Sequence, residues 1–384
     1  MLFKILYTAF MTKIAFVTNA PPFSGMGKPA REVFSRLREN NIDSDFFYLD
    51  ASHGEILKND EKIVGLRDLP RPLGVKPVQW WRLARKLPKQ GYDFWHIGNQ
   101  TLSFIPRQNF LLTVYDLIEL VDPQEMFGSF VAKYLYKGIS RAKHIICVSE
   151  YTKKVLQKVY HIPGEKITVI PLAVGEHFKP LENIRQSIGY QEFLSLNNLP
   201  NNAKIILHVG SDHPRKNLNL LAEILARVKK SVPNVYLIKV GAPGLKAGRL
   251  EFQNKLSDLK VSDAVRFIDN TTDEKLAMIY AMADVFIFPS LYEGFGVPPL
   301  EAMACGCPVV ASNATSIPEV IGDASPMHDP TDIVGFTASV QRVLNDANYA
   351  AELKQKGIER TKFFSWDEIA KKTAEVYESM LYAV

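Results

Sequence analysis

The sequence contains only three cysteines, Cys147, Cys305 and Cys307, and each lies in an apolar run. An odd number of thiols in such runs argues against a disulfide framework and favours a reducing compartment. No second thiol or histidine pair accompanies Cys305 and Cys307, so small buried side chains explain them better than a metal or redox site.

Long hydrophobic runs are also lacking. No stretch reaches the roughly 18 apolar residues of a membrane-spanning helix. Residues 1–10 are apolar but include Lys4 and no cleavage-site pattern, so they do not predict a signal peptide. Because Met11 is followed directly by a strand-like segment, we expect translation to start at Met11 and residues 1–10 to be a start-site artefact.

Acidic residues are scarce in the first half of the chain. The formal net charge is +5, yet residues 1–190 hold 26 Lys+Arg against 18 Asp+Glu, and the remainder holds 20 against 23. The segment from Arg67 to Lys89 is basic and contains Trp80 and Trp81, which predicts contact with an anionic membrane surface. A solvated helix with one buried tryptophan explains this segment equally well. Absence of co-sedimentation with anionic liposomes at low salt would exclude the membrane contact.

Nucleic acid is not an expected partner, because the interleaved aromatic and basic motif of an RNA-binding sheet is missing. What the chain does contain is a regular alternation of short apolar strands and helical patterns, which predicts βαβ units and parallel sheets. A length of 384 residues exceeds one ordinary core. Residues 172–202 lack a sustained apolar period and are typical of a connection between domains.

We therefore predict two doubly wound α/β domains, residues 1–180 and 203–365, followed by a helix in residues 366–384. The predicted strands are Ile14–Thr18, Phe46–Leu49, Phe94–Ile97, Leu111–Tyr115, Ile145–Val148, Ile167–Ile170, Ile205–Val209, Tyr236–Val240, Val265–Ile268, Val285–Phe288 and Val309–Ala311. In such sheets ligands bind where strands end and helices begin.

Two glutamates, Glu293 and Glu301, frame a run of glycines and prolines between a strand pattern and a helix pattern. Free backbone N–H groups at such a turn attract anions, and carboxylates beside it suit hydrogen bonds from hydroxyls. Earlier in the same half, Gly210 ends a strand, and Arg215 and Lys216 stand at the start of the next helix. Cations there oppose the helix dipole, which indicates a bound anion such as a phosphate.

Gly25, Gly27 and Ala30 fit the G-x-G-x-x-A dinucleotide pattern, with Asp45 and Asp50 about 20 residues further on. Taken alone, this pattern would predict an NAD-dependent oxidoreductase. Six residues separate the first strand from the glycines, however, whereas the first glycine of that fingerprint lies in the immediate turn.

The run from Glu293 to Val310 and the Gly210…Arg215-Lys216-Asn217 motif resemble the signatures of the retaining glycosyltransferases of family 4 (group 1). The resemblance implies a GT-B fold, with two Rossmann-like domains facing a central cleft and a C-terminal helix that crosses back to the N-terminal domain. It also implies that Arg215 and Lys216 bind the donor diphosphate, that Glu293 binds the transferred sugar and that Glu301 binds the ribose. Further donor contacts are implied for Gly25, Gly27, His96, Gly210, Gly241, Ile268, Gly294, Phe295, Gly296 and Val297.

Two positions need separate comment. His96 ends an aromatic strand that resembles a family strand near the cleft. Family members often carry His-Asp-Leu where this chain has Tyr115, Asp116 and Leu117. We predict that Tyr115 and Asp116 are catalytic, with the tyrosine donating a hydrogen bond to a sugar hydroxyl.

The resemblance predicts transfer of a hexose, with mannose from GDP-mannose preferred over UDP-glucose, to a glycan or glycolipid acceptor. Front-face displacement assisted by the donor phosphate is expected, because no clear carboxylate nucleophile stands in the first half. Asp43-Ser-Asp45 matches a metal motif of another glycosyltransferase fold, but its place before an apolar strand predicts a turn; no essential metal or cofactor is expected. The expected location is cytoplasmic, with peripheral attachment to the inner face of the cell membrane. The alternatives are a sugar-nucleotide epimerase of the same fold, an oxidoreductase and a catalytically silent binding protein.

Overall fold

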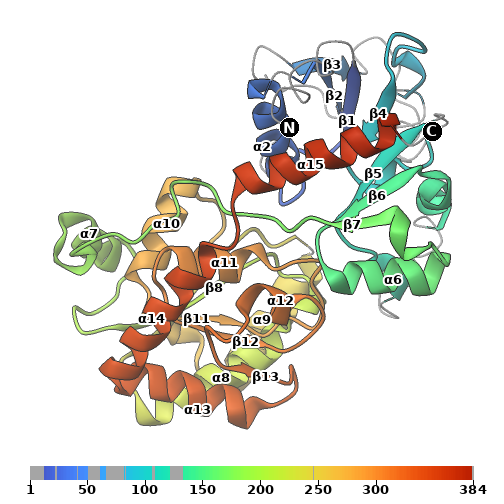
Figure 1. Cartoon of the computed structure of the whole chain (residues 1–384). Coiled ribbons are helices and arrows are strands. Elements are labelled where there is room, and N and C mark those ends of the chain that lie inside the picture. The colour runs from blue at the N-terminus through green and yellow to red at the C-terminus, as the bar shows by residue number, and fades with distance from the viewer. Residues whose placement is uncertain are drawn as a thin grey trace. The chain divides into compact units, whose positions relative to one another are not determined.

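The computed structural model describes residues 13–21, 24–40, 42–50, 61–65, 82, 84–105, 109–121, 133–244 and 246–382 (Figure 1). The chain divides into two compact units. The first comprises Met1–Ala173 with Ser365–Val384, and the second comprises Val174–Phe364. Residues 1–10 and most of the segment from Arg67 to Lys89 lie outside the described residues, so the start-site and membrane predictions stay predictions. Among the described residues, no helix is both long and apolar enough to cross a membrane.

The first unit is built on a seven-stranded sheet in the order β3-β2-β1-β4-β5-β6-β7, and every neighbouring pair is parallel. Its strands are β1 (Ile14–Thr18), β2 (Ser44–Asp50), β3 (Glu61–Gly65), β4 (Phe94–Ile97), β5 (Phe110–Val114), β6 (His144–Cys147) and β7 (Ile167–Val169). All residues of β1 and β4 are buried. Burial of consecutive residues means that both faces of the sheet are covered, as expected for parallel strands joined by helices.

Helices α2 (Gly27–Glu39) and α15 (Trp366–Tyr382) lie side by side in the first unit, although more than 300 residues separate them in sequence (Figure 1). Arg36 Nε donates to Asp367 Oδ1 at 3.0 Å between these helices, and Lys143 Nζ donates to the Met380 carbonyl at 2.8 Å. The predicted return of the C-terminal helix to the N-terminal domain is therefore confirmed.

The second unit has a six-stranded parallel sheet in the order β10-β9-β8-β11-β12-β13. Its strands are β8 (Lys204–Val209), β9 (Val235–Val240), β10 (Val265–Ile268), β11 (Val285–Phe288), β12 (Val309–Ser312) and β13 (Met327–His328). Its helices include α7 (Ile188–Leu196), α8 (Leu218–Ser231), α9 (Lys246–Asp258), α10 (Asp273–Met282), α11 (Val297–Ala304), α12 (Ile317–Ile321), α13 (Ile333–Asn345) and α14 (Ala347–Thr361). Two doubly wound α/β units are the predicted fold class.

Each sheet has one point at which the strand order reverses. In the first unit this point lies between β1 and β4, and in the second it lies between β8 and β11. The connections leaving the two strands at such a point run to opposite sides, which opens a crevice at their carboxyl ends where α/β sheets bind ligands. The fold therefore directs attention to the loops that follow β1, β4, β8 and β11.

Two sequence interpretations were wrong in detail. Residues 172–202 contain a helix, α7, whose first turn is capped by the Ser187 hydroxyl accepting from Tyr190 N at 3.1 Å. Its Ile188 and Leu196 are 78% and 84% exposed, so the apolar period that marks most helices is absent. Asp45 lies within β2 and not in a turn; its carboxylate accepts from the Tyr92 hydroxyl at 2.6 Å.

Candidate functional site

The second unit gathers two cations and one carboxylate at its switch point. Arg215 and Lys216 belong to a 3₁₀ helix, Pro214–Lys216, in the loop after β8, whereas Glu293 lies in the loop after β11. Arg215 Nη1 lies 2.8 Å from Glu293 Oε2, and Lys216 Nζ lies 2.6 Å from Glu293 Oε1. We call these three residues the Lys216 cluster. It carries one excess positive charge at the edge where an anion would bind.

Burial and charge act in opposite directions within the Lys216 cluster. Glu293 is 7% exposed and Lys216 is 5% exposed. Burial raises the pKa of Glu293, but the charges of Lys216 and Arg215 and the hydrogen bond from Lys216 outweigh it and lower that pKa to about 2. Burial lowers the pKa of Lys216, and the Glu293 carboxylate opposes that shift. Glu293 is therefore ionised near neutral pH and serves as a hydrogen-bond acceptor, not as a general acid.

Side-chain and backbone hydrogen bonds join the two loops that carry the Lys216 cluster to each other and to Pro330. Asn217 adopts a left-handed conformation with φ of 56°, which asparagine tolerates better than most residues. Its Nδ2 donates to the carbonyls of Pro289 and Pro330 at 3.2 and 2.8 Å. Leu291 N donates to the Arg215 carbonyl at 2.8 Å. The cations and Glu293 are thus held by the same set of contacts.

A second support comes from the loop after β12. Glu293 N donates to Thr315 Oγ1 at 3.0 Å, and that hydroxyl donates in turn to the Glu293 carbonyl at 3.1 Å. Ser316 Oγ lies 2.9 Å from the carbonyls of both Glu293 and Phe295. The sequence interpretation did not select Thr315 or Ser316. The signal for them was the largely polar run Ser-Asn-Ala-Thr-Ser, which begins with the last residue of the buried strand β12.

The other predicted glutamate, Glu301, lies in α11, the helix that follows the glycine turn. Its Oε2 accepts from the Tyr280 hydroxyl at 2.9 Å. Gly296 caps the helix with φ of 115°, a conformation that strains any other residue. Donor contacts were also predicted for Gly294, Phe295 and Val297. Gly294 and Phe295 lie in the turn before the helix, and Val297 is the first residue of α11.

Gly210, Gly241 and Ile268 meet at the carboxyl ends of β8, β9 and β10. Gly241 N donates to the Ile268 carbonyl at 2.8 Å. A Cβ atom on Gly241 would lie 2.3 Å from the Gly210 carbonyl oxygen, and φ of Gly241 is 120°. Both the close approach and the backbone conformation therefore require glycine at position 241. The structure brings these three predicted residues together.

In the first unit, the predicted glycines differ in how tightly they are constrained. Gly27 is the first residue of α2, and a Cβ atom there would lie 1.8 Å from the Pro21 carbonyl oxygen. A Cβ atom on Gly25 would meet nothing within 4 Å. The packing of α2 against the preceding loop accounts for Gly27 without a dinucleotide.

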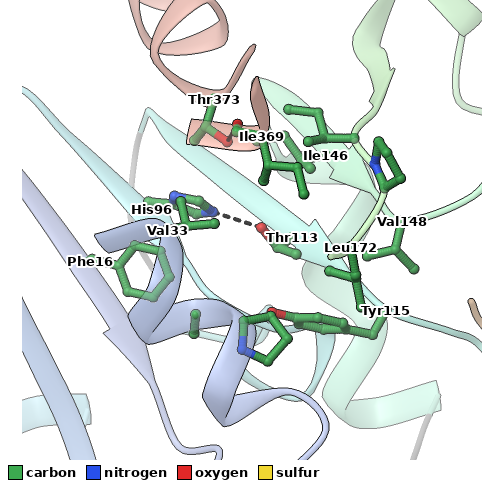
Figure 2. Close-up of a pocket in the computed structure, with 14 residues that line it drawn as sticks. Phe16, Val33, His96, Thr113, Tyr115, Ile146, Val148, Leu172, Ile369 and Thr373 are labelled. Atoms are coloured by element: carbon green, nitrogen blue, oxygen red, sulfur yellow. Dashed lines mark hydrogen bonds between the residues drawn. The ribbon is translucent and has the colours of Figure 1, made fainter. Parts of the chain in front are cut away.

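A cavity of about 30 Å³ lies within the first unit. Most of the side chains that line it are apolar (Figure 2). His96 faces it, with Nε2 2.7 Å from Thr113 Oγ1 and Nδ1 2.7 Å from the Tyr377 hydroxyl of α15. Burial lowers the pKa of His96 to about 3, so the ring is neutral. Both ring nitrogens have partners inside the unit, and the cavity has room for little more than a water molecule.

Tyr115 also lines this cavity (Figure 2). Its hydroxyl donates to the Met26 carbonyl at 3.2 Å, and its backbone N donates to Gln100 Oε1 at 3.2 Å. Burial raises the pKa of Tyr115, so the phenol stays protonated. Tyr115 thereby links the end of β5 to the loop before α2. Asp116 Oδ1 accepts from Ile118 N at 3.4 Å at the start of α4 (Ile118–Val121).

We expect Tyr115→Phe to lower the free energy of unfolding by about 1 kcal/mol, the usual net value of one hydrogen bond. In contrast to the catalytic role predicted from the family pattern, turnover should stay within about threefold of the wild type, because the Tyr115 hydroxyl is already bonded to the Met26 carbonyl. Urea unfolding and initial-rate kinetics on the same preparation check both values. A fall in turnover of about 100-fold with unchanged stability would instead establish direct catalysis by the hydroxyl.

The switch point of the first unit carries a polar group that the sequence interpretation missed. Asn99, fully buried, donates from Nδ2 to Asn19 Oδ1 at 2.8 Å and to Thr18 Oγ1 at 3.2 Å. Thr101 Oγ1 lies 3.3 Å from Asn19 Oδ1. Thr18 ends β1, Asn19 follows it, and Asn99 and Thr101 follow β4. Their hydrogen bonds fix the loops at the carboxyl edge of that sheet. Single amides give no periodic signal in the sequence.

Two family models match the chain, and together they cover most of both units. The model described as glycosyltransferase family 4 matches residues 23–176, and the model described as glycosyl transferases group 1 matches residues 191–360. The chain belongs to the family 4 glycosyltransferases. The second match contains the whole Lys216 cluster and Glu301.

Several bacterial mannosyltransferases are similar to this chain in sequence. O-antigen chain mannosyltransferase B of Escherichia coli is 31% identical over 65% of this chain and 64% of its own length. The serotype-specific mannosyltransferase WbdA of E. coli is 31% identical over 67% of this chain and 32% of its own length. The match thus spans less than two thirds of each of these two relatives. O-antigen chain mannosyltransferase RfbU of Salmonella typhimurium is 26% identical over 83% of this chain and 87% of its own length.

Solved structures show the same fold at lower identity. Sucrose-phosphate synthase from Thermosynechococcus elongatus superposes with a TM-score of 0.79 at 23% identity, over 97% of this chain and all of that one. Anabaena HepE in complex with UDP-glucose superposes with a TM-score of 0.76 at 18% identity, over 96% of this chain and 99% of that one. WaaG, a glycosyltransferase involved in lipopolysaccharide biosynthesis, has a TM-score of 0.74 at 16% identity, over 94% of this chain and 99% of that one. The GT-B fold of this family 4 glycosyltransferase is therefore established.

Proposed function

We propose that the chain is a retaining glycosyltransferase that transfers a hexose from a nucleotide-diphospho-sugar to a glycan or glycolipid acceptor. GDP-mannose is the preferred donor. The Lys216 cluster carries this proposal, because it places two cations and an ionised carboxylate at the switch point of the second sheet. The mannosyltransferases among the relatives and the UDP-glucose complex of the related fold support a nucleotide-sugar donor.

Each member of the site has a role that its chemistry allows. Arg215 and Lys216 bind the diphosphate, the arginine with its planar fork and the lysine as a point charge. Glu293 accepts a hydrogen bond from a hydroxyl of the transferred sugar, for which its ionised state at neutral pH is required. Glu301 accepts from the ribose hydroxyls, and Tyr280 holds its carboxylate in place.

The transfer step follows from this distribution of charge. The bond between the sugar C1 and the phosphate oxygen breaks while a bond from C1 to the acceptor oxygen forms on the same face. The acceptor proton passes to the departing phosphate oxygen, so the products are the glycoside and the nucleoside diphosphate. Arg215 and Lys216 stabilise the negative charge that grows on that phosphate. Glu293 takes no proton in this scheme.

Binding of a panel of GDP-, UDP- and ADP-sugars, followed by thermal shift, tests the proposal. We expect stabilisation by one sugar nucleotide, with GDP-mannose strongest, because a ligand that binds only the folded state raises the melting temperature. Incubation of the stabilising donor with and without acceptor then separates two activities. Consumption of the donor without an acceptor would indicate an epimerase, and stabilisation by NAD alone would overturn the proposal.

The proposed location is the cytoplasmic side of the cell membrane, with peripheral attachment. Cys147, Cys305 and Cys307 are buried and form no disulfide, in keeping with a reducing compartment. Two relatives are named as O-antigen chain mannosyltransferases, and that name favours a glycan or glycolipid acceptor here. The liposome experiment given for the segment from Arg67 to Lys89 tests the attachment.

A further inference from the structure

A lysine is buried beneath the loops of the donor side of the second unit. Lys239 lies in β9, and its side chain is 0% exposed. Its Nζ donates to the carbonyl oxygens of Gly210 and Gly241 at 2.7 and 3.0 Å. It also forms an ion pair with Asp212. A fully buried ammonium is costly unless it is paired and hydrogen-bonded, and Lys239 meets both conditions.

Asp212 is the member of this group that leads to the Lys216 cluster. It lies between Gly210 and Lys216, and its side chain is fully buried between Lys239 and Arg249. Arg249, in α9, also contacts Asp269 at 2.9 Å and stacks over the ring of Phe267 at 4.3 Å. The loop that carries the diphosphate-binding cations is therefore anchored from β9 and α9 through one carboxylate.

Lys239 also fixes the direction of two peptide groups. In a trans peptide the C=O and N–H bonds point in opposite directions. The carbonyls of Gly210 and Gly241 point at the buried ammonium, so the amide N–H groups of Ser211 and Ala242 point away from it. Both follow the carboxyl ends of strands, where outward amides bind anions. No hydrogen bond from either amide is present within the described part of the chain.

We propose that Lys239 is a positioning residue of the donor site, which holds Asp212 and turns the amides of Ser211 and Ala242 toward the nucleotide diphosphate. This inference rests on the proposed function, because it assigns the diphosphate to the carboxyl ends of β8 and β9. Lys239 touches no substrate itself. It acts through two carbonyl groups and one carboxylate.

The second unit offers a matched control at the opposite edge of the same sheet. Asp284 is held there by Lys204 at 3.5 Å and by Arg185 at 3.0 Å, much as Asp212 is held by Lys239 and Arg249. Lys204 is the first residue of β8, whereas the loop with Arg215 follows its last residue. Lys204→Met therefore removes a lysine–aspartate pair of the same unit without touching the donor edge.

The test compares donor kinetics of Lys239→Met, Lys204→Met and the wild type. Methionine keeps the length of the side chain, and Arg249 still pairs with Asp212, so folding should be retained. We expect Lys239→Met to raise KM for the donor about 10- to 100-fold. Replacing an outer-shell residue that orients a metal ligand has an effect of this size. KM of Lys239→Met for the acceptor should stay within about twofold of the wild-type value. Lys204→Met should keep KM for the donor and for the acceptor within about twofold of the wild type.

A merely structural role would lower the active fraction, and so kcat, without changing donor KM. An unchanged donor KM in Lys239→Met would overturn the inference. If Lys239→Met fails to fold, Asp212→Asn serves in its place, because it removes the charge of the carboxylate through which Lys239 acts, and donor KM should rise in the same direction. The double variant Lys239→Met with Asp212→Asn should be less impaired than the two single effects combined, because the lysine acts through that carboxylate.

Titration calorimetry with GDP and with pyrophosphate separates this inference from the proposed function. If the wild type binds both but transfers no sugar, the proposed function fails, and loss of affinity in Lys239→Met still supports the positioning role. If the wild type transfers sugar, and Lys239→Met binds GDP with the same affinity as the wild type, only the positioning role fails.

Discussion

Lys216→Ala should lower kcat/KM for the sugar donor by about 100- to 1,000-fold, the usual loss when one preorganised donor to a developing oxyanion is removed. Lys216 is buried, and its ammonium lies 2.6 Å from Glu293, so its charge acts in a region with little water to screen it. Arg215 still pairs with Glu293 in the variant, and the unit should fold. Initial rates with saturating acceptor measure the effect.

The matched control is Lys229→Ala, in α8 of the same unit. Lys229 pairs with Asp263 at 3.7 Å on the surface, and surface pairs contribute little. Its kcat/KM should remain within about twofold of the wild type. Wild-type turnover in Lys216→Ala, with a melting temperature equal to that of the control, would refute the assignment of the donor site.

Glu293→Gln should destabilise the second unit by about 3 kcal/mol at neutral pH. Folding lowers the pKa of this carboxyl from 4.5 to about 2, and every tenfold change in its acid dissociation constant corresponds to about 1.4 kcal/mol. A depressed folded-state pKa stabilises the protein above the unfolded-state value. This contribution is therefore complete above about pH 4.5 and is lost progressively as the pH falls toward 2.

Hydrogen exchange of the amides in β8 and β11 reports the stability of the second unit by itself. Between pH 6 and pH 3 the wild type should lose more protection than Glu293→Gln, because the variant has no carboxyl to protonate. Glu192→Gln, on the exposed face of α7, should follow the wild type at every pH. Parallel pH profiles for the wild type and Glu293→Gln would show that the cluster does not stabilise the fold.

The interior of both sheets could be predicted from the sequence because consecutive apolar residues leave few alternatives. The bounds of β1, β4, β10 and β11 are those expected from the residues. The strand β3 was missed because Glu61–Gly65 contains two charged residues at its start, and β13 because it has only two residues. Such edge strands are defined by pairing with a neighbour and not by their own apolar pattern.

The candidate site could be predicted in part, because some of its residues are of a type that is unusual at their position. Cations at a helix start are costly without a ligand, which marks Arg215 and Lys216. A glycine after a strand indicates a tight turn, which marks Gly296 and the neighbouring Glu293. Their mutual pairing could not be foreseen, since 77 residues separate Lys216 from Glu293 in the chain. Lys239 looked like an ordinary strand residue. Only the strand register, which sets it beside β8, reveals what its ammonium contacts.

The return of α15 to the first unit has a consequence for synthesis of the protein. The first unit needs Tyr377 beside His96 and Asp367 beside Arg36, yet these partners are translated only after all of the second unit. The N-terminal unit therefore leaves the ribosome with the α2 face that α15 covers still open, and the second unit is complete before the first. Domains usually complete folding in the order of their synthesis. In this chain we expect that order to be reversed, because the last helix of the first unit is synthesised after the whole second unit.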